Sequence, residues 1–339
     1  MICRLFISLK PCMKSPVVLL LLLSVFTWSC GDSSLTRTLP NVSGTAGEVL
    51  VVIDQSLWDG ETGQLLRDNL TGEIKTLPQP EPAFDLVRIP PAGFRDRFML
   101  YRSIMMIEID PSTKDVSVSS IRNQYAESQL LISIKAPDVL LLKEALTRRI
   151  DKIKQLIDDC ELERVTSVLV RSAGNERCIT SSGGSSAELI MPAGYRTDFS
   201  REGLSIVSCE TPSSTQSLII AFLKPGIRVV KGERLLQMTD SIMSAEIKGP
   251  DGVSFMKVEN KAQVVERIMK RNNRDYDEMR GLWTLEGGYM GGPFISCAVS
   301  DTVSSRTIIV TGFIYAPKEK KRELLRQVEA LIYSLKVLS

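Results

Sequence analysis

The chain has 339 residues, of which 43% are apolar, 42 are Lys or Arg and 40 are Asp or Glu. This composition allows one large or two smaller folded domains, and the lack of a basic run interleaved with aromatic residues argues against nucleic acid as a partner. The sequence contains no histidine, which excludes Ser-His-Asp and Cys-His catalysis, H-E-x-x-H zinc sites and histidine-based acid–base chemistry.

Residues 1–29 have the parts of a secretory signal peptide in the usual order. Three basic residues precede the apolar run 17–26, and small residues follow it. A run of about ten residues is too short for a permanent membrane-spanning helix. The Ser-Cys-Gly sequence centred on Cys30 resembles the lipobox of bacterial lipoproteins, in which the cysteine is diacylated and becomes the mature N-terminus.

We therefore expect lipidation of Cys30, a tether over residues 30–46, and a folded body held at the cell envelope. The resemblance implies the outer membrane, on its periplasmic or its surface face. The alternative is an ordinary cleaved signal peptide in which Cys30 is incidental. Translation could begin at Met1 or at Met13. Without residues 1–29 the chain has 39 basic against 40 acidic residues, so the secreted part is nearly neutral.

The first half of the body alternates strand and helix patterns. The apolar run 48–54 predicts a buried strand, and the leucines after Asp59 have helical spacing up to Leu70. Further strands are predicted, followed by a long helix with one apolar stripe; the strands span 84–89, 103–109 and 128–137, and the helix spans 138–159.

The second half has elements in a similar order. Strands are predicted at 187–191, 204–210 and 217–225, and a helix at 231–245. "PPAGFRDRF" at 90–98 and "MPAGYRTDF" at 191–199 share their Pro-Ala-Gly-aromatic-Arg and Phe positions. The sequence therefore predicts an α+β fold in which one β-rich unit with packed helices is duplicated, with mixed or antiparallel sheets.

Two units follow from this duplication. The first spans 47–180 and the second spans 187–339, with the Gly- and Ser-rich segment 181–187 as a flexible connection. The two copies would share a β–β–β–α topology, and Phe98 and Phe199 would be buried at equivalent places.

The C-terminal part completes the second unit. It is predicted to contain a strand at 254–260, a helix near 261–272 and two strands around a glycine-rich turn within 280–300. A strand at 307–317 and a closing helix at 318–335 follow.

Several segments together resemble the Bacteroidota lipoprotein family known as domain of unknown function 4837. They are "AGEVLVVID", "LWDG", "LPQPEPAF", "RGLW", "MGGPF" and the closing "FIYAPKEKKRELLRQVEALIYSLK". The resemblance extends over nearly all of residues 40–337. It implies an envelope lipoprotein and implies no established activity.

The sequence "EGGYMGGPF" at 286–294 is the sharpest candidate for ligand contact. Its four glycines allow a close approach of the backbone, and Tyr289 and Met290 stand between them. If the protein has a binding site, we expect it where this loop meets the strand ends. The alternative is a long hairpin turn with both side chains packed beneath it.

Three other residues are weaker candidates for ligand binding. Trp283 could stack against a ligand, although a tryptophan near a strand end is more often a core anchor. Arg95 and Arg196 occupy matching places in the two motifs and could each hold a carboxylate or phosphate. The alternative is that each arginine pairs with a neighbouring acid.

The sequence has no motif for a cofactor, a metal or a catalytic residue. The carboxylate pairs Glu108/Asp110 and Asp158/Asp159 fit solvated charges better than a glycosidase site. The body cysteines are too widely spaced for a metal or redox signature, and their disulfide pairing stays open; they are Cys160, Cys178, Cys209 and Cys297.

The sequence thus favours a lipid-anchored binding or assembly protein of the cell envelope over an enzyme. Its partners would be the membrane, through the lipid, and an unknown envelope protein or small ligand. The alternative is an envelope hydrolase that works with carboxylates and without histidine. A hydrolase would have a deep pocket with two convergent acids of perturbed pKa, whereas a binding module would have an apolar or arginine-lined groove.

Overall fold

The structure is a computed structural model that describes residues 38–227, 230–271, 274–301 and 305–338. The predicted signal peptide, Cys30 and the first part of the predicted tether, residues 30–37, lie outside the described residues. Within the described part of the chain, no helix has the length and apolar character needed to cross a membrane.

The first sheet is mixed and contains five strands in the order β2-β1-β3-β5-β4. The pairs β1–β2, β1–β3 and β3–β5 are parallel, and β4 is an antiparallel edge strand. The strands are β1 (Glu48–Val52), β2 (Asp85–Ile89), β3 (Ser103–Ile109), β4 (Ser117–Arg122) and β5 (Leu130–Ala136).

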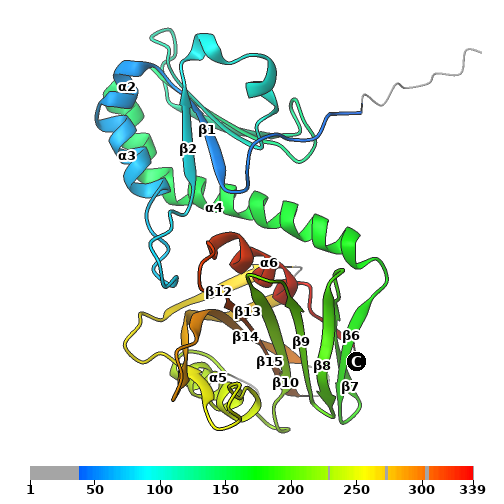
Figure 1. Cartoon of the computed structure of the whole chain (residues 1–339). Coiled ribbons are helices and arrows are strands. Elements are labelled where there is room, and N and C mark those ends of the chain that lie inside the picture. Colours follow the sequence, from blue (N-terminus) through cyan, green and yellow to red (C-terminus); the bar gives the residue numbers. More distant parts are fainter. Residues whose placement is uncertain (1–37, 228–229, 272–273, 302–304, 339) are drawn as a thin grey trace, which may run out of the picture. The chain divides into compact units, whose positions relative to one another are not determined.

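Strand β1 is apolar from Val49 to Val52 because both faces of this sheet are covered. Val49 and Val51 belong to the core beneath the helices, whereas Leu50 and Val52 belong to a smaller cluster on the other face. The helices are α2 (Gln55–Asp59), α3 (Glu61–Leu70) and α4 (Val139–Ala173), and Figure 1 shows them beside β1 and β2. The other face packs against the segment 90–101, including Phe98.

Helix α4 is longer than the sequence predicted. It begins after Asp138, whose carboxylate accepts a hydrogen bond from the Leu141 amide at 2.9 Å. It continues past residue 159 to Ala173 and ends at Gly174, whose φ of 51° an L-residue rarely adopts. The extra turns are helical because Leu162 and Ala173 pack into a second core, which a single apolar stripe does not show.

The second sheet is antiparallel and follows the order β11-β13-β14-β15-β10-β9-β8, with β12 paired to β13 beside β11. The strands are β8 (Tyr195–Arg201), β9 (Leu204–Glu210), β10 (Thr215–Phe222), β11 (Phe255–Val258), β12 (Val265–Arg271), β13 (Arg274–Glu286), β14 (Gly291–Asp301) and β15 (Arg306–Tyr315).

Two helices cover opposite faces of this sheet. Leu218 and Ile220 of β10 pack with α6 (Arg322–Tyr333), while Ile219 and Ala221 pack with α5 (Glu233–Glu246). Figure 1 shows α5 and α6 on either side of the strands. The alternation explains the continuous apolar runs of β10 and β15, since each face has its own core.

The segment 181–187, predicted as a flexible connection, is instead a tight hairpin. It joins β6 (Arg177–Ser182) to β7 (Ser185–Ile190), and β16 (Lys336–Leu338) completes this three-stranded sheet. Gly183 and Gly184 form the turn with φ of 53° and 84°. The glycines are there because the turn needs positive φ.

The α+β class with mixed and antiparallel sheets is confirmed, but the predicted copying of one β–β–β–α unit is wrong. The first region pairs its central strands in parallel, whereas β8, β9 and β10 form an antiparallel meander. Phe98 packs against a core cluster, but Phe199 is 44% exposed on an edge strand. The shared motif lies in two 3₁₀ helices in one place and runs into a strand in the other.

The helix predicted near 261–272 is also wrong, because strand β12 occupies most of this range. The segment pairs residue by residue with β13, from Val265 opposite Arg280 to Arg271 opposite Arg274. Pairing to a neighbouring strand thus outweighs a local pattern that fits either element. The four body cysteines are free thiols, and Cys160, Cys178 and Cys297 are buried.

Candidate functional site

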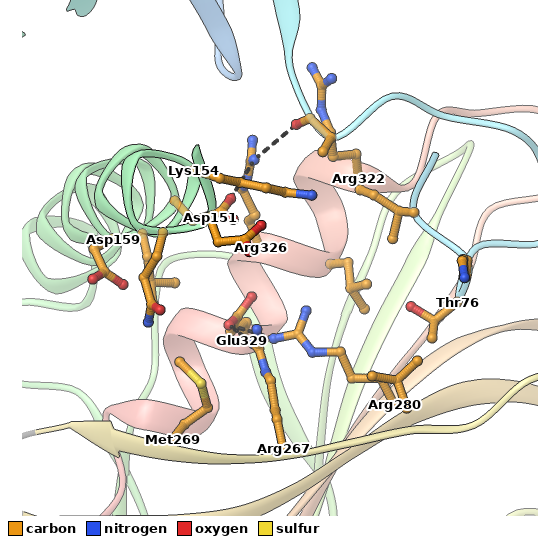
Figure 2. A pocket seen from close by; sticks show the side chains of 18 of the residues that line it. Thr76, Asp151, Lys154, Asp159, Arg267, Met269, Arg280, Arg322, Arg326 and Glu329 are labelled. Carbon is orange, nitrogen blue, oxygen red and sulfur yellow. Dashed lines mark hydrogen bonds and ion pairs between the residues drawn. The ribbon is translucent and has the colours of Figure 1, made fainter. Parts of the chain in front are cut away.

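A cavity of about 610 Å³ is lined by side chains of α4, α6, β12, β13 and the loop around residue 74. Such a volume is typical of sites for small molecules. Figure 2 shows Arg267 and Arg280 beside Glu329 of α6. The charged lining residues are Lys75, Lys154, Arg267, Arg271, Arg280, Arg322, Arg326, Glu73, Asp151, Asp158, Asp159 and Glu329.

Arg267, Arg280 and Glu329 form the floor of the cavity, and Glu278 lies buried behind them. Arg280 donates to Glu278 at 2.7 Å through its Nε, and Arg267 donates to the same oxygen. Arg267 also donates to Glu329 at 2.7 Å, and Arg280 Nη2 lies 2.5 Å from the same Glu329 oxygen. Each carboxylate thus neutralises part of both guanidinium charges.

Strand register and helix packing bring these four residues together. Arg267 and Glu278 are directly opposite each other in the β12–β13 pair, and opposite charges at such positions attract. Glu329 comes from α6, whose side facing the sheet is buried. The side chain of Glu278 is fully buried, while those of Arg280 and Glu329 are 14% and 11% exposed.

The electrostatics of this floor keep Glu278 ionised and its neighbours protonated. Burial alone would raise the pKa of Glu278, but the guanidiniums of Arg280 and Arg267 outweigh it and lower that pKa from 4.5 to about 2. Burial raises the pKa of the Tyr333 phenol, and the Glu329 and Glu278 carboxylates raise it further. Tyr333 donates its hydroxyl hydrogen to Glu278.

The Cys297 thiol, near the same floor, is not set up as a nucleophile. Its sulfur lies 3.8 Å from Glu278 Oε2. Burial raises the pKa of Cys297 well above its ordinary value, and the Glu278 carboxylate adds to this effect. A buried, protonated thiol is unreactive.

The walls of the cavity contain further ion pairs. Arg326 lies 3.2 Å from Asp158, and Arg271 pairs with Asp159. Burial raises the pKa of Asp158, while Arg326 opposes that rise. The prediction that Asp158 and Asp159 end a helix is wrong, because α4 continues beyond them. Their side chains are 47% and 27% exposed, and each pairs with an arginine.

Helix α6 also joins the first sheet to the cavity. Glu81 accepts hydrogen bonds from the backbone amides of Lys321 at 2.7 Å and Arg322 at 3.0 Å, at the start of α6. Arg322 in turn donates to the Pro82 carbonyl at 2.9 Å and to Asp85 at 2.8 Å. These bonds fix the position of Arg322 and Arg326 in the cavity wall.

Some cationic groups of the cavity keep unused donors. Arg271 Nε is buried without a hydrogen-bond acceptor, whereas Arg280 Nη2 is buried and reaches Glu329 at ion-pair distance without hydrogen-bond geometry. The Lys154 ammonium has no ion-pair partner among the residues that the structure describes. Figure 2 shows Lys154 extending from α4 into the space that the arginines surround. Within the described ranges there is no group of His, Cys, Asp or Glu that could hold a metal ion.

The candidates from the glycine-rich loop do not line this cavity. Trp283 is buried in the core beneath α5 and donates to the Ile314 carbonyl at 3.2 Å. Met290 packs against the same core. Tyr289 is fully exposed at the turn between β13 and β14. Trp283 and Met290 therefore contribute to one core, and of the three residues Tyr289 alone faces solvent.

The two motif arginines also lie outside the cavity. Arg95 is exposed in the segment between the two 3₁₀ helices. Arg196 is more than half exposed and pairs with Asp198 and Glu210 at 2.9 Å each. Arg196 thus has the neighbouring acids that the sequence offered as the alternative to anion binding.

Sequence reasoning missed the cavity residues of β12, β13 and α6. Treating 261–272 as a helix hid the period of two that places Arg267, Met269 and Arg271 at alternate positions of β12. In α6, the leucine stripe predicts which face is buried, but it does not indicate that Arg326 and Glu329 are buried as well. The signal in the sequence that could have indicated the cavity was the presence of charged residues at buried positions of two elements that pack together.

Comparison with known proteins gives few further clues. No curated protein matches the chain. The Ran-binding protein Mog1p of Saccharomyces cerevisiae is 7% identical with a TM-score of 0.32, covering 48% of this chain and 95% of its own. LpqN, involved in cell envelope biogenesis of Mycobacterium tuberculosis, is 12% identical with a TM-score of 0.29, covering 50% and 95%.

A structure from Bacteroides thetaiotaomicron is 11% identical with a TM-score of 0.26, covering 45% of each chain. TM-scores this low establish neither a shared fold nor a shared function. The resemblance to domain of unknown function 4837, predicted over 40–337, is narrower than expected, because a different family model matches the first half. Residues 42–170 match Domain of unknown function (DUF8532) and residues 185–334 match Domain of unknown function (DUF4837), so the chain carries two domains of unknown function.

Proposed function

We propose that this chain is a lipid-anchored protein of the cell envelope that binds a ligand in the arginine-lined cavity. The observation that carries the proposal is the cavity of about 610 Å³, whose lining is rich in arginine. An arginine-lined cavity is the feature that favours a binding module over a hydrolase.

The ion pairs of the cavity support binding rather than hydrolysis. A carboxylate hydrolase needs two acids that converge on one bond. Here Asp158 pairs with Arg326, Asp159 with Arg271, and Glu329 with Arg267 and Arg280. Each of these carboxylates is therefore held by an arginine, which fixes its side chain.

A binding site in the cavity predicts that filling it blocks ligand retention. Val265 lines the cavity and is the cross-strand partner of Arg280 in the β12–β13 pair. The substitution Val265→Trp would occupy part of the cavity. We expect at least about a tenfold loss of retained ligand, equivalent to ~1.4 kcal/mol. The measurement is mass spectrometry of small molecules that immobilised protein retains from an envelope extract.

Val253→Trp is the matched control, because Val253 is 80% exposed and does not line the cavity. It should retain the same compounds as the unchanged protein. The double variant Tyr289→Ala, Met290→Ala tests the loop predicted from the sequence, and it should also retain them. If the double variant alone loses the retained compounds and Val265→Trp still retains them, the binding site is the loop and not the cavity.

The proposed anchor predicts that Cys30 is the lipidated N-terminus. Cys30→Ser should release the protein from the membrane fraction, because the acyl chains that hold it are lost. Mass spectrometry of the N-terminal peptide and membrane fractionation measure the effect. Cys209→Ser is the control and should stay with the membrane. An unmodified N-terminus in the unchanged protein would contradict the anchor.

A further inference from the structure

We infer that the ligand of the cavity is an amphipathic anion, that is, a carboxylate, phosphate or sulfonate group carried on an apolar body. This inference rests on the proposed function, because it takes the cavity to be the binding site. Two features carry it: unused cationic donors from separate elements, and apolar walls beside them.

The first feature is a surplus of donors on the cavity floor. Arg267 and Arg280 make three hydrogen bonds to Glu278 and Glu329, and two guanidiniums have many more N–H groups than these bonds use. Arg280 Nη2 reaches Glu329 at ion-pair distance but without hydrogen-bond geometry, and it is buried.

Further donors around the cavity lie on β12 and α4. Arg271 Nε on β12 is buried without an acceptor, although its Nη2 pairs with Asp159. Lys154 on α4 has no ion pair in the described part of the chain. Among the residues that line the cavity, seven are basic and five are acidic. The lining residues thus carry a net positive charge, and three of the acids, Asp158, Asp159 and Glu329, pair with arginines.

Glu278 does not line the cavity and acts behind it. It is fully buried and accepts from both floor guanidiniums. It therefore orients Arg267 and Arg280 and leaves their remaining N–H groups for the cavity side. Arginine pairs of this kind suit carboxylate and phosphate because the planar fork can donate two parallel hydrogen bonds.

The second feature is the apolar surface of the walls. Side chains of the loop, α4, β12 and α6 contribute it, and they are Ile74, Leu162, Val265, Ile268, Met269 and Leu325. Ile268 is 71% exposed. An inorganic ion would leave this surface in water, whereas an apolar body would bury it at about 25 cal/mol per Å². An adaptable methionine among the walls suits ligands of varied shape.

Two dyes that differ by one charged group test the inference. 1-Anilinonaphthalene-8-sulfonate carries a sulfonate on an apolar body, and N-phenyl-1-naphthylamine is its neutral analogue. We expect the sulfonate dye to bind at least about tenfold more tightly, because its anion meets the unused donors. Fluorescence titration of the folded protein without residues 1–29 and with Cys30→Ser measures both affinities.

Variants assign the preference to named cations. Lys154→Met should weaken the sulfonate dye several-fold and leave the neutral dye unchanged, while Lys152→Met on the exposed side of α4 should change neither. Arg280→Met removes a cation from the buried floor and could unfold the protein, so Lys154→Met and Arg271→Met are the decisive variants. Circular dichroism melts verify that each variant is folded.

Competition distinguishes the sources of the anion. Displacement of the sulfonate dye by dodecanoate assigns a carboxylate ligand, displacement by dodecyl phosphate assigns a phosphate ligand, and both should outcompete inorganic phosphate. If the two dyes bind equally tightly and Val265→Trp abolishes the binding of both, the cavity is the binding site but the inference that its ligand is an anion is wrong. Dye binding that Val265→Trp leaves unchanged, or no dye binding, would overturn both proposals.

Discussion

Glu278→Gln is expected to lower the free energy of unfolding by about 3–5 kcal/mol, since breaking a buried ion pair leaves its partner charge uncompensated. Glu278 is fully buried and pairs with Arg267 and Arg280, and it accepts a hydrogen bond from Tyr333. A glutamine has the same shape, but it removes the negative charge and turns one acceptor into a donor that faces a guanidinium.

The same residue predicts a pH dependence with a defined sign. The folded-state pKa of Glu278 is lowered from 4.5 to about 2, with the two arginines outweighing the opposing effect of burial. A lowered folded-state pKa contributes stability that is complete above the unfolded value and is lost as the pH falls through the folded value. The stability difference between the unchanged protein and Glu278→Gln should therefore shrink as the pH falls from about 4.5 towards about 2.

Urea unfolding of both proteins at several pH values measures this effect, because the midpoint and slope give the free energy. Glu163→Gln is the control. Glu163 pairs with Arg122 at 2.6 Å, but its side chain is 61% exposed, so its loss should cost no more than about 1 kcal/mol. A Glu278→Gln variant as stable as this control would show that the floor does not depend on the buried charge.

Gly292→Ala is expected to cost about 3 kcal/mol or more, because overpacking against a fixed backbone forces strands apart. A Cβ atom at position 292 would lie 2.0 Å from the Ile314 carbonyl oxygen and 3.2 Å from Trp283 Nε1. The Trp283 indole donates to that same carbonyl at 3.2 Å. Relief of the clash would move β14 away from β15 and break this hydrogen bond.

Gly72→Ala is the control for this substitution. The nearest atom to its added Cβ would be the Asp68 carbonyl oxygen at 3.4 Å, which is ordinary contact. The change should stay within about 1 kcal/mol. Thermal melting and urea titration compare the two variants. Equal stability of Gly292→Ala and Gly72→Ala would show that the second glycine pair of the loop serves something other than strand packing.

Several elements could be predicted from the sequence because the pattern of apolar and polar residues along each element reflects which of its faces are buried. The continuous apolar run of β1 indicates a strand covered on both faces, and the structure has cores on both sides of it. The leucine stripe of α6 likewise predicts a helix against a sheet. Strand β10 and the β13–β14 hairpin follow for the same reason. These signals are local, since each side chain reports the face of its own element.

The structure of other elements depends on contacts with neighbouring elements, which the local sequence pattern does not indicate. Strand β12 resembles a helix in isolation, and its pairing with β13 makes it a strand. Helix α4 continues beyond residue 159 because its last turns pack into a second core. The two similar motifs differ in structure because one packs against a face of the mixed sheet and the other begins an edge strand.

The sequence by itself determined the α+β class, most element positions and the exclusion of histidine chemistry. Only the tertiary structure decided the cavity, whose ion pairs join residues far apart in the chain, such as Arg326 with Asp158 and Arg271 with Asp159. Periodicity tells which face of an element is buried, but not which charge on another element it meets. A charge becomes part of a site only when packing removes water and supplies its partner.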